Sequence, residues 1–318
     1  MRILFMGTPD FAVPILDTLA KHHEVLAVVC QPDRPKGRGK SVIFPPVKEK
    51  ALELGLNVLQ PEKVRGNDDF VEEITALGAD IFVVVAYGQI LPPRILRIPP
   101  KGCVNIHASL LPKYRGAAPM QRAILNGDRE TGITIQYMDK GMDTGDMILK
   151  KAIPIDENDR FADVHDKMVV LSCECILETL RLIEAGNAPR EAQNHEEATY
   201  APMLAKEEGV INWNDTSEKI ANQVRALDPW PGTFTYYNGQ VLKIWECKRS
   251  DILSEAIPGT VLEADKHLLV KTGDGVLSIT MLQGQGSKKM NAADYLRGRS
   301  IEVGAVLCTP ESKQEQSM

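Results

Sequence analysis

The first half of the chain alternates short apolar runs with segments in which apolar residues recur every three or four positions. Runs of the first kind predict β-strands, and segments of the second kind predict α-helices. Residues 81–86 (Ile-Phe-Val-Val-Val-Ala) are apolar on both faces, which is typical of an interior strand in a parallel sheet that helices cover on both sides. The alternation therefore predicts an α/β fold with a doubly wound, mostly parallel, Rossmann-like sheet.

The periodicity also places the individual elements of this region. The expected strands span residues 2–6, 25–30, 57–59, 81–86, 102–106, 133–138 and 147–155. The expected helices span residues 13–21, 47–54, 68–77, 119–125 and 159–184. Gly186 follows the last helix as a C-cap signal.

The pattern changes after the long helix. Residues 187–198 are polar with no clear period, which favours a linker. Beyond them, Asn238-Gly239 separates two β-rich runs, a strong hairpin signal. Short strands with little helix predict a small, OB-like β-barrel. We therefore expect a first domain at residues 1–189, a linker at 190–206, a barrel at 207–310 and a disordered tail at 311–318.

One helix is expected within the second domain. It spans residues 216–227, and Asp215 and Glu218 are expected to form a capping pair at its start.

Composition narrows the class of protein. The 318-residue chain carries a net charge of -6, so its overall charge does not suggest a nucleic-acid binder. Its six cysteines include no CxxC pair, which indicates reduced thiols rather than a disulfide framework or a zinc site. No apolar run approaches the roughly 20 residues that span a bilayer, and glycine and proline come too early for a signal peptide. We expect a cytoplasmic protein without membrane association. In the absence of a heptad or other dimer signal, we also expect a monomer with no obligate protein partner.

Candidate chemistry begins at Asn105-Ile106-His107, where a predicted strand ends. Side chains alternate along a strand, so Asn105 and His107 share one face. Ligands bind beyond the carboxyl ends of strands in open α/β sheets. An amide and an imidazole there can polarise a carbonyl, hold an oxyanion and move a proton. On spacing alone, however, a structural histidine and a turn asparagine are the more frequent explanation.

Two loops shift that balance. Residues 109–116 (Ser-Leu-Leu-Pro-Lys-Tyr-Arg-Gly) are largely apolar, whereas an ordinary βα connection is short and polar, so this loop favours a pocket wall. Residues 138–146 contain three aspartates, but their spacing does not match an EF-hand calcium loop. An aspartate that orients a neutral histidine and accepts a proton from an amine is the alternative.

In combination, these segments resemble the signature of the folate-dependent formyltransferases. The resemblance rests on residues 105–112, Arg115-Gly116 and Asp143-Thr144-Gly145. It implies a metal-free catalytic trio of Asn105, His107 and Asp143, in residues 1–189, with 10-formyltetrahydrofolate as the formyl donor. It also implies a folate site lined by Ser109, Leu110, Leu111 and Pro112 and by Tyr87, Gly88, Gln89, Ile90 and Leu91.

A basic loop after the second strand indicates the acceptor. From residue 33 to 50 there are six Lys or Arg and two acids, in a chain that is acidic overall. A short charge run is usually a solvated surface, but glycines between cations make a flexible loop that can follow a phosphate backbone. With residues 7–12 and 228–232, this loop resembles the family members that formylate the amino acid on a charged initiator tRNA, for translation initiation. That resemblance covers about residues 1–310. It implies tRNA binding by the barrel, and acceptor-stem contacts from Arg34, Lys36, Arg38 and Lys40.

Other interpretations remain open. Formyltransferases that act on amino-sugar nucleotides have a similar second domain, and we expect them to lack the basic loop. Those that act on glycinamide ribonucleotide lack a comparable barrel and need a glycine- and serine-rich phosphate loop, which Gly7-Thr8-Pro9-Asp10 is not. A non-catalytic nucleotide- or RNA-binding module would have no use for the trio. The single Gly7 after the first strand also gives no dinucleotide-binding fingerprint.

Overall fold

We describe the protein from a computed structural model, in residues 1–36 and 41–308. The tail predicted to be disordered, residues 311–318, lies outside these residues. The chain divides into two compact units. The first comprises Met1–Pro119, Glu130–Pro154 and His165–Ala201. The second comprises Met120–Arg129, Ile155–Val164 and the described chain from Pro202 onward. The functional division into residues 1–189, 190–206 and 207–310 stays our proposal.

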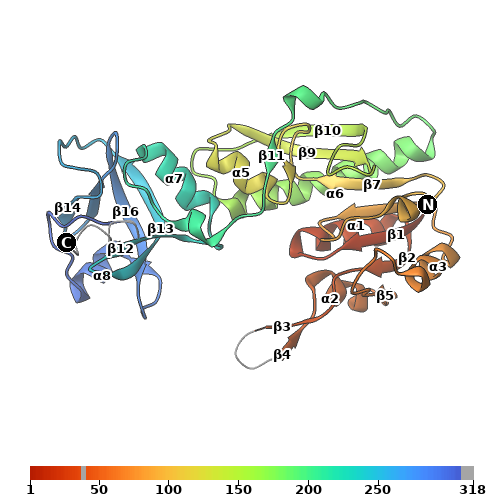
Figure 1. The fold of residues 1–318 in the computed structure, drawn as a ribbon, viewed down its shortest axis with the longest axis horizontal. Coiled ribbons are helices and arrows are strands. Elements are labelled where there is room, and N and C mark those ends of the chain that lie inside the picture. Colours follow the sequence, from red (N-terminus) through yellow and green to blue (C-terminus); the bar gives the residue numbers. More distant parts are fainter. Residues whose placement is uncertain (37–40, 309–318) are drawn as a thin grey trace. The chain divides into compact units, whose positions relative to one another are not determined.

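A seven-stranded sheet forms the centre of the first unit, in the order β10-β9-β7-β6-β1-β2-β5 (Figure 1). Strands β7, β6, β1, β2 and β5 are parallel, whereas β9 and β10 join antiparallel. The chain builds outward from β1 in both directions, so the predicted doubly wound, mostly parallel sheet is confirmed. The strands are β1 (Arg2–Gly7), β2 (Glu24–Val29), β5 (Val58–Leu59), β6 (Ile81–Val85), β7 (Cys103–His107), β9 (Glu130–Tyr137) and β10 (Met147–Pro154).

Five described helices of this region lie where the periodicity predicts them, and a sixth, α4 (Pro93–Leu96), was not predicted. The long helix α6 begins in the second unit and continues into the first. The other helices of this region are short, and α5 lies almost wholly in the second unit. Their bounds are α1 (Val13–His22), α2 (Pro46–Glu53), α3 (Asp68–Ala76), α4 (Pro93–Leu96), α5 (Pro119–Leu125) and α6 (Phe161–Glu184).

Both faces of the parallel sheet are buried. Leu4 and Phe82 belong to a core cluster that also contains Phe70 of α3. Ile3 and Val83, which alternate with them and face the other side, are also 0% exposed. Every residue of β6 is buried, which confirms the predicted interior strand. This two-sided core fixes the edge of the sheet from which the candidate residues project.

An antiparallel sheet forms the centre of the second unit, with strand order β12-β13-β16-β15-β14 and β17 beside β16. Asn238 and Gly239 have φ angles of 48° and 74°, the left-handed pair of the predicted hairpin turn. This strand set confirms the small OB-like β-domain. The elements are α7 (Ser217–Ala226), β12 (Thr233–Tyr237), β13 (Gln240–Ser250), β14 (Val261–Ala264), β15 (Leu268–Lys271), β16 (Val276–Gly284), β17 (Met290–Asn291) and α8 (Ala292–Gly298).

The predicted capping pair of α7 is wrong. The N-cap is Thr216, whose hydroxyl accepts a hydrogen bond from the backbone N–H of Lys219 at 3.1 Å. Asp215 lies one residue too early and instead accepts from the ammonium of Lys219. The helix therefore begins one residue later than the pair required: the threonine accepts the N–H of Lys219, whereas a cap at Asp215 would have accepted that of Glu218.

Several short elements were not predicted because they have too few residues for a period. Strands β3 (Arg34–Lys36) and β4 (Ser41–Ile43) pair antiparallel. Strand β8 (Arg115–Gly116) pairs in parallel with β11 (Tyr200–Ala201). Strand β11 belongs to the segment predicted as a linker, so the chain leaving the first unit contributes to its structure. Turns of 3-10 helix occupy Asp10–Ala12, His195–Glu197 and Lys206–Gly209.

Candidate active site

Strand β7 places Asn105 and His107 on one face at the carboxyl edge of the sheet. The intervening Ile106 is 3% exposed and packs into the opposite layer, as the alternation predicts. Across the antiparallel pairing with β9, Asn105 faces Gln136 and His107 faces Thr134. Two neighbouring strands therefore present four polar side chains on a common surface.

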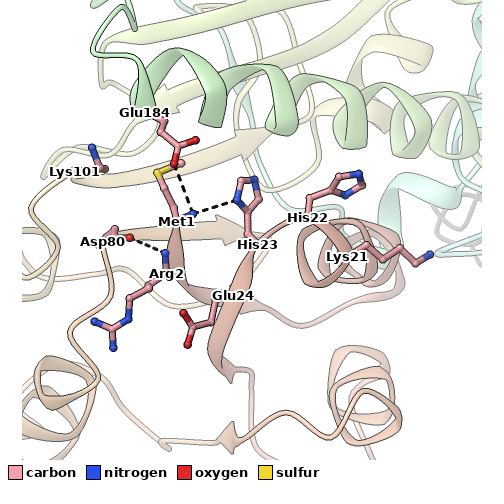
Figure 2. A pocket seen from close by; sticks show the side chains of 9 residues that line it. All are labelled: Met1, Arg2, Lys21, His22, His23, Glu24, Asp80, Lys101 and Glu184. Atoms are coloured by element: carbon pink, nitrogen blue, oxygen red, sulfur yellow. Dashed lines mark hydrogen bonds and ion pairs between the residues drawn. The ribbon is translucent and has the colours of Figure 1, made fainter.

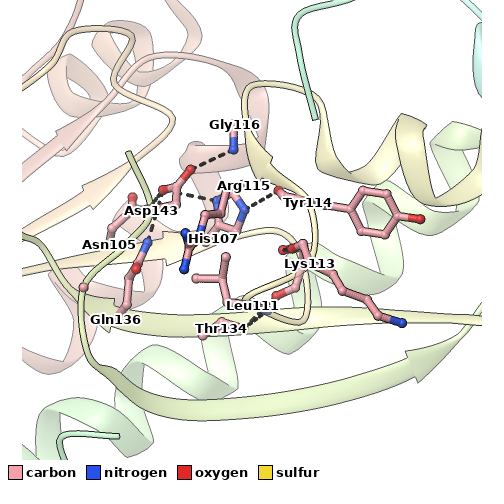
Figure 3. Close-up of polar contacts among 12 residues, drawn as sticks. Asn105, His107, Leu111, Lys113, Tyr114, Arg115, Gly116, Thr134, Gln136 and Asp143 are labelled. Atoms are coloured by element: carbon pink, nitrogen blue, oxygen red, sulfur yellow. Dashed lines mark hydrogen bonds and ion pairs between the residues drawn. The ribbon is translucent and has the colours of Figure 1, made fainter. Parts of the chain in front are cut away.

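Asp143 joins this group from the loop between β9 and β10 (Figure 3). Its Oδ1 accepts hydrogen bonds from Gln136 Nε2 at 3.1 Å and from Asn105 Nδ2 at 3.4 Å, and lies 3.6 Å from His107 Nδ1. Its Oδ2 accepts from the backbone N–H of Gly116 at 2.9 Å. The predicted trio is thus brought together, with the carboxylate at its centre and N–H donors on both oxygens.

His107 has a defined arrangement of its ring nitrogens. Its side chain is 6% exposed, and Nε2 lies 2.9 Å from the carbonyl oxygen of Tyr114. A carbonyl can only accept, so Nε2 carries a proton and donates it to that oxygen. The nitrogen that faces Asp143 is therefore Nδ1. When the ring is neutral, Nδ1 has a lone pair directed at the site, and it can take up a proton there.

Gly116 lets the loop of residues 109–116 approach both Asp143 and strand β11. Its φ angle is 123°, and a Cβ at this position would lie 2.7 Å from the carbonyl oxygen of Ala201. Any side chain would force β8 away from β11 and displace the N–H that binds Asp143. The resemblance pointed to Arg115-Gly116, and the structure gives the glycine a physical reason.

Thr134 organises the start of the same loop. Its hydroxyl donates to the carbonyl of Ser109 at 2.7 Å and accepts from the N–H of Leu111 at 3.1 Å. Ser109 in turn donates through Oγ to the carbonyl of Lys113 at 2.6 Å. Of the predicted folate-site residues, Ser109, Leu111 and Pro112 are buried and Leu110 is half-buried. Their side chains shape the loop from within.

The second predicted folate segment divides between core and surface. Tyr87 and Leu91 are 2% and 3% exposed and pack in the core cluster beneath the sheet. The amide of Gln89 holds the chain at Pro61–Val64 through three backbone hydrogen bonds. Ile90 is 84% exposed, and Gly88 has a φ angle of 90°. Of the apolar side chains in this stretch, that of Ile90 is open to a ligand, and folate binding here stays a proposal.

The predicted tRNA loop is described in part. Arg34 begins β3 and is exposed, and Lys36 ends it. Arg38 and Lys40 lie outside the described residues. The role of all four in tRNA binding stays a proposal.

Three further residues around Asp143 escaped the sequence analysis as functional candidates: Gln136, Gln193 and the guanidinium of Arg115. Gln193 lies in the aperiodic segment predicted as a linker, and it is 6% exposed. Gln136 had a usable signal, because Thr134 and Gln136 alternate with buried Ile133 and Ile135 in one strand. Gln193 had none, because no local pattern indicates which way a side chain in an irregular segment points.

The thiol on the same strand face is not a nucleophile. Cys103 precedes Asn105 by two residues and is 2% exposed. Burial raises the pKa of its thiol to about 12, so the reactive thiolate is not formed near neutral pH. The chemistry of this face therefore rests on the amide, imidazole and carboxylate groups.

A separate pocket of about 700 Å³ opens at the opposite, amino-terminal edge of the sheet (Figure 2). There the Met1 ammonium lies 3.4 Å from His23 Nδ1 and 3.9 Å from a carboxylate oxygen of Glu184. Burial is the main cause of a lowered pKa for His23. The pocket is polar and lies at the wrong end of the strands for a ligand site of an open α/β sheet.

In residues 1–36 and 41–308, no three His, Cys, Asp or Glu side chains gather as a metal site would require. Among the helices described, none combines the length and apolar character that a bilayer crossing requires.

Comparison with known proteins identifies the family. Residues 1–180 match the family model described as formyl transferase, and residues 203–300 match the one described as formyl transferase, C-terminal domain. The chain belongs to the formyl transferase family. A formyl transferase of Caldanaerobacter subterraneus subsp. tengcongensis named methionyl-tRNA formyltransferase is 50% identical over 96% of this chain and 100% of its own. The Bacillus subtilis protein of the same name is 48% identical over 96% of this chain and 97% of its own.

Several solved structures show the same fold at low sequence identity. The N-formyltransferase of Helicobacter canadensis, crystallised with folinic acid and dTDP-3-aminofucose, superposes with a TM-score of 0.68 at 21% identity, over 91% of this chain and 99% of that chain. HypX of Aquifex aeolicus with tetrahydrofolic acid gives 0.64 at 21% identity, over 93% of this chain and 47% of that chain. Glycinamide ribonucleotide transformylase 1 of Symbiobacterium toebii gives 0.51 at 22% identity, over 61% and 93%.

Proposed function

We propose that this formyl transferase moves the formyl group of 10-formyltetrahydrofolate onto the α-amino group of methionyl initiator tRNA, for translation initiation. The observation that carries the chemistry is the convergence of Asn105, His107 and Asp143 at the carboxyl edge of the sheet. The near-full-length similarity to proteins named methionyl-tRNA formyltransferase supports the acceptor. We also propose a cytoplasmic location, because aminoacylated initiator tRNA is used there, and a monomer without an obligate protein partner.

The mechanism follows from what each side chain can donate or accept. The amine nitrogen forms a bond to the formyl carbon, and the carbonyl oxygen becomes an oxyanion. An amide has two N–H donors, so Asn105 can keep its contact with Asp143 and direct the other N–H at the oxyanion. A preorganised donor of this kind lowers the activation barrier by on the order of 3–4 kcal/mol.

Asp143 and His107 handle the proton. Asp143 is an acceptor held by three donors, and it can receive the proton that the attacking amine loses. Nδ1 of His107 lies 3.6 Å from Oδ1 of Asp143. The proton can therefore pass from Asp143 to the ring, and from the ring to N10 of the folate as the bond between the formyl carbon and N10 breaks. No covalent enzyme intermediate or metal is part of this scheme.

We propose that the donor lies against the loop at Ser109, Leu110, Leu111 and Pro112 and the segment from Tyr87 through Leu91. The exposed Ile90 supports an apolar contact, and the buried members support the backbone that shapes the wall. For the acceptor, Arg34, Lys36, Arg38 and Lys40 supply charge for phosphates of the acceptor stem, and the barrel supplies further contacts.

An acceptor competition assay tests the proposal. The enzyme is given 10-formyltetrahydrofolate with charged initiator tRNA or with an amino-sugar nucleotide, and formyl transfer to each is measured. We expect transfer to the tRNA alone, and we expect deacylated tRNA to accept nothing. Preferential transfer to the sugar would overturn the acceptor while leaving the chemistry intact. Transfer to neither, with folate failing to raise the melting temperature, would overturn both.

A charge variant tests the basic loop. Arg38→Ala should weaken tRNA-dependent activity severalfold at low salt, and the gap should narrow as salt rises, because one phosphate contact fewer lowers the salt slope. Lys21→Ala is the matched control, since Lys21 is an exposed lysine that pairs with Asp17. Equal salt dependence of Arg38→Ala and the unmodified enzyme would contradict a phosphate contact by Arg38.

A further inference from the structure

We propose that Gln193 is a positioning residue for formyl transfer, one that fixes the backbone of Asp143 and aims its carboxylate through Gln136. Gln193 lies between the two regions that match the formyl transferase models, residues 1–180 and 203–300. The proposal rests on the role of Asp143 in the proposed function. It concerns formyl transfer itself, and so it holds for any amine acceptor.

The contacts of Gln193 define which way its amide points. Oε1 accepts from Nε and Nη2 of Arg115 at 3.1 and 2.7 Å. A guanidinium can only donate, so the oxygen must face it. Nε2 donates to the backbone carbonyls of Asp143 and Gly145, both at 2.8 Å. Carbonyls can only accept, so both ends of the amide agree on one orientation.

That orientation also settles the amide of Gln136. Gln193 Nε2 also donates to Gln136 Oε1 at 3.1 Å, so its two N–H groups are shared among three oxygens, and Gln136 Nε2 donates to Asp143 Oδ1 at 3.1 Å. The N–H groups therefore all point the same way along a chain from Arg115 through Gln193 and Gln136 to the carboxylate. Hydrogen bonds in such a chain polarise one another. Because Gln136 is 2% exposed and Gln193 6%, water does not screen them.

Gln193 also braces an unfavourable backbone. Asp143 has a φ angle of 55°, in the left-handed region that residues with a Cβ seldom occupy. The two carbonyls that Gln193 binds belong to Asp143 and to Gly145, on either side of the next residue. Gly145 is packed against β9, where a Cβ would lie 1.7 Å from the carbonyl oxygen of Tyr137. The hydrogen bonds from Gln193 and the close packing of Gly145 against β9 therefore both hold the loop in this conformation.

The segment that bears Gln193 is itself anchored on both sides. Glu191 exchanges two backbone hydrogen bonds with Met147 at the start of β10. Tyr200–Ala201 pairs as β11 with Arg115–Gly116 of β8. Arg115 is 2% exposed, and its Nη2 also lies 3.0 Å from His195 Nδ1. Gln193 therefore has little freedom to move relative to Asp143, as a positioning role requires.

Gln193→Glu separates positioning from folding. The carboxylate has the same size and keeps Arg115 as a partner, but it cannot donate to the carbonyls of Asp143 and Gly145 or to Gln136. We expect kcat to fall at least tenfold, with KM for both substrates changed less than twofold. The melting temperature should fall because two buried carbonyls lose their donor, but it should stay well above the assay temperature because the carboxylate keeps Arg115 as its partner. Asn194→Asp is the matched control on the neighbouring exposed residue, where an acid can still accept from the N–H of Glu196, and it should retain full kcat.

A double-mutant cycle with Asp143→Asn tests the route of the effect. If Gln193 acts through Asp143, then Gln193→Glu should cost little further activity once Asp143 has been replaced. An undiminished tenfold loss in that background would overturn the proposal, as would normal kcat in Gln193→Glu alone. The assay uses whichever acceptor the unmodified enzyme formylates, so a wrong acceptor in the proposed function does not affect the outcome. A loss of kcat in Gln193→Glu that only tracks a lowered melting temperature would also overturn it, because that is a structural effect.

Discussion

The edge of the parallel sheet and the core of the antiparallel sheet bury side chains to the same extent but with opposite chemistry. At the sheet edge, His107, Arg115, Gln136 and Gln193 are between 2% and 6% exposed. In the antiparallel sheet, Leu277 and its neighbours form an apolar cluster, with residues that are mostly 0–4% exposed. The first region is ordered by hydrogen bonds with fixed directions, and the second by contacts without direction.

This difference predicts how each region responds to substitution. A buried polar group must keep its partners, because leaving one unsatisfied costs about 1–3 kcal/mol. Replacing a polar side chain at the sheet edge therefore changes the alignment of its hydrogen-bond partners, and with it the activity, more than it changes the packed volume. Replacement in the apolar cluster leaves a cavity and lowers the free energy of unfolding. The following substitutions test that contrast.

Asn105→Ala and Asp143→Ala should give the largest effect, a loss of kcat of roughly two to three orders of magnitude with normal folding. The first removes an oxyanion donor, and the second removes the proton acceptor. Steady-state kinetics with charged tRNA measure kcat, and a circular-dichroism melt measures whether folding is normal. Asn187→Ala, at an exposed position, should retain full activity. Turnover near that of the unmodified enzyme in either variant would remove the trio as the catalytic centre.

Leu277→Ala should give the converse result. Leu277 is 0% exposed in the apolar cluster, so its truncation should destabilise the second unit by about 3 kcal/mol. The three tryptophans, Trp213, Trp230 and Trp245, all belong to that unit, and their fluorescence during urea unfolding reports it selectively. Leu253→Ala, at a position 90% exposed, is the control. Equal midpoints for the two variants would contradict the contrast.

Thr134→Val should have an intermediate effect on both quantities. It preserves volume but removes the acceptor of the Leu111 N–H and the donor to Ser109, so we expect about 2 kcal/mol of destabilisation and reduced kcat. Thr131→Val is a matched substitution in the same strand. The Thr131 hydroxyl is buried without a hydrogen-bond partner among the described residues, so its replacement should be neutral or stabilising. Identical effects would show that only volume counts at this edge.

Asp274→Asn should give the smallest effect, and one that depends on pH. The pKa of Asp274 is lowered chiefly by the hydrogen bond from the backbone N–H of Ser217 at the start of α7. A lowered pKa in the folded state adds stability above the unfolded pKa of about 4, and that stability is lost as pH falls below it. Because Asp274 is exposed and solvent screens the interaction, we expect at most about 1 kcal/mol of destabilisation at pH 7, and this difference should be lost as the pH falls through the lowered pKa of the folded state. Asp265→Asn, at an exposed position, is the control variant.

The sequence predicted most of the fold because its strands and helices have clear periods. Residues 81–86 indicated a strand buried on both faces, and β6 is such a strand. The shared face of Asn105 and His107 followed from alternation alone. The short pairs β3–β4 and β8–β11 could not be predicted, because two or three residues carry no period. The functions of the folate and tRNA residues stay predictions.

The surroundings of Asp143 needed tertiary structure. Its loop places a residue other than glycine at a φ of 55°, which no local signal indicates. Asn105 reaches it through the pairing of β7 with β9. Gln193 reaches it from a segment that lies 50 residues farther along the chain. Such contacts depend on which strands become neighbours, and apolar patterning does not specify the partner of each polar side chain.

The antiparallel register of β7 and β9 has a consequence for the accuracy of the site. Asn105 faces Gln136 and His107 faces Thr134, while Ile106 faces Ile135 on the other side. A slip of one residue would turn Ile133 and Ile135 toward the polar face and bury Thr134 and Gln136 in the apolar layer. The same hydrophobic force that selects the fold therefore rejects a misaligned active site. A slip between these two strands therefore shifts by a whole residue or not at all, and a slipped register is too unstable to persist in the folded protein.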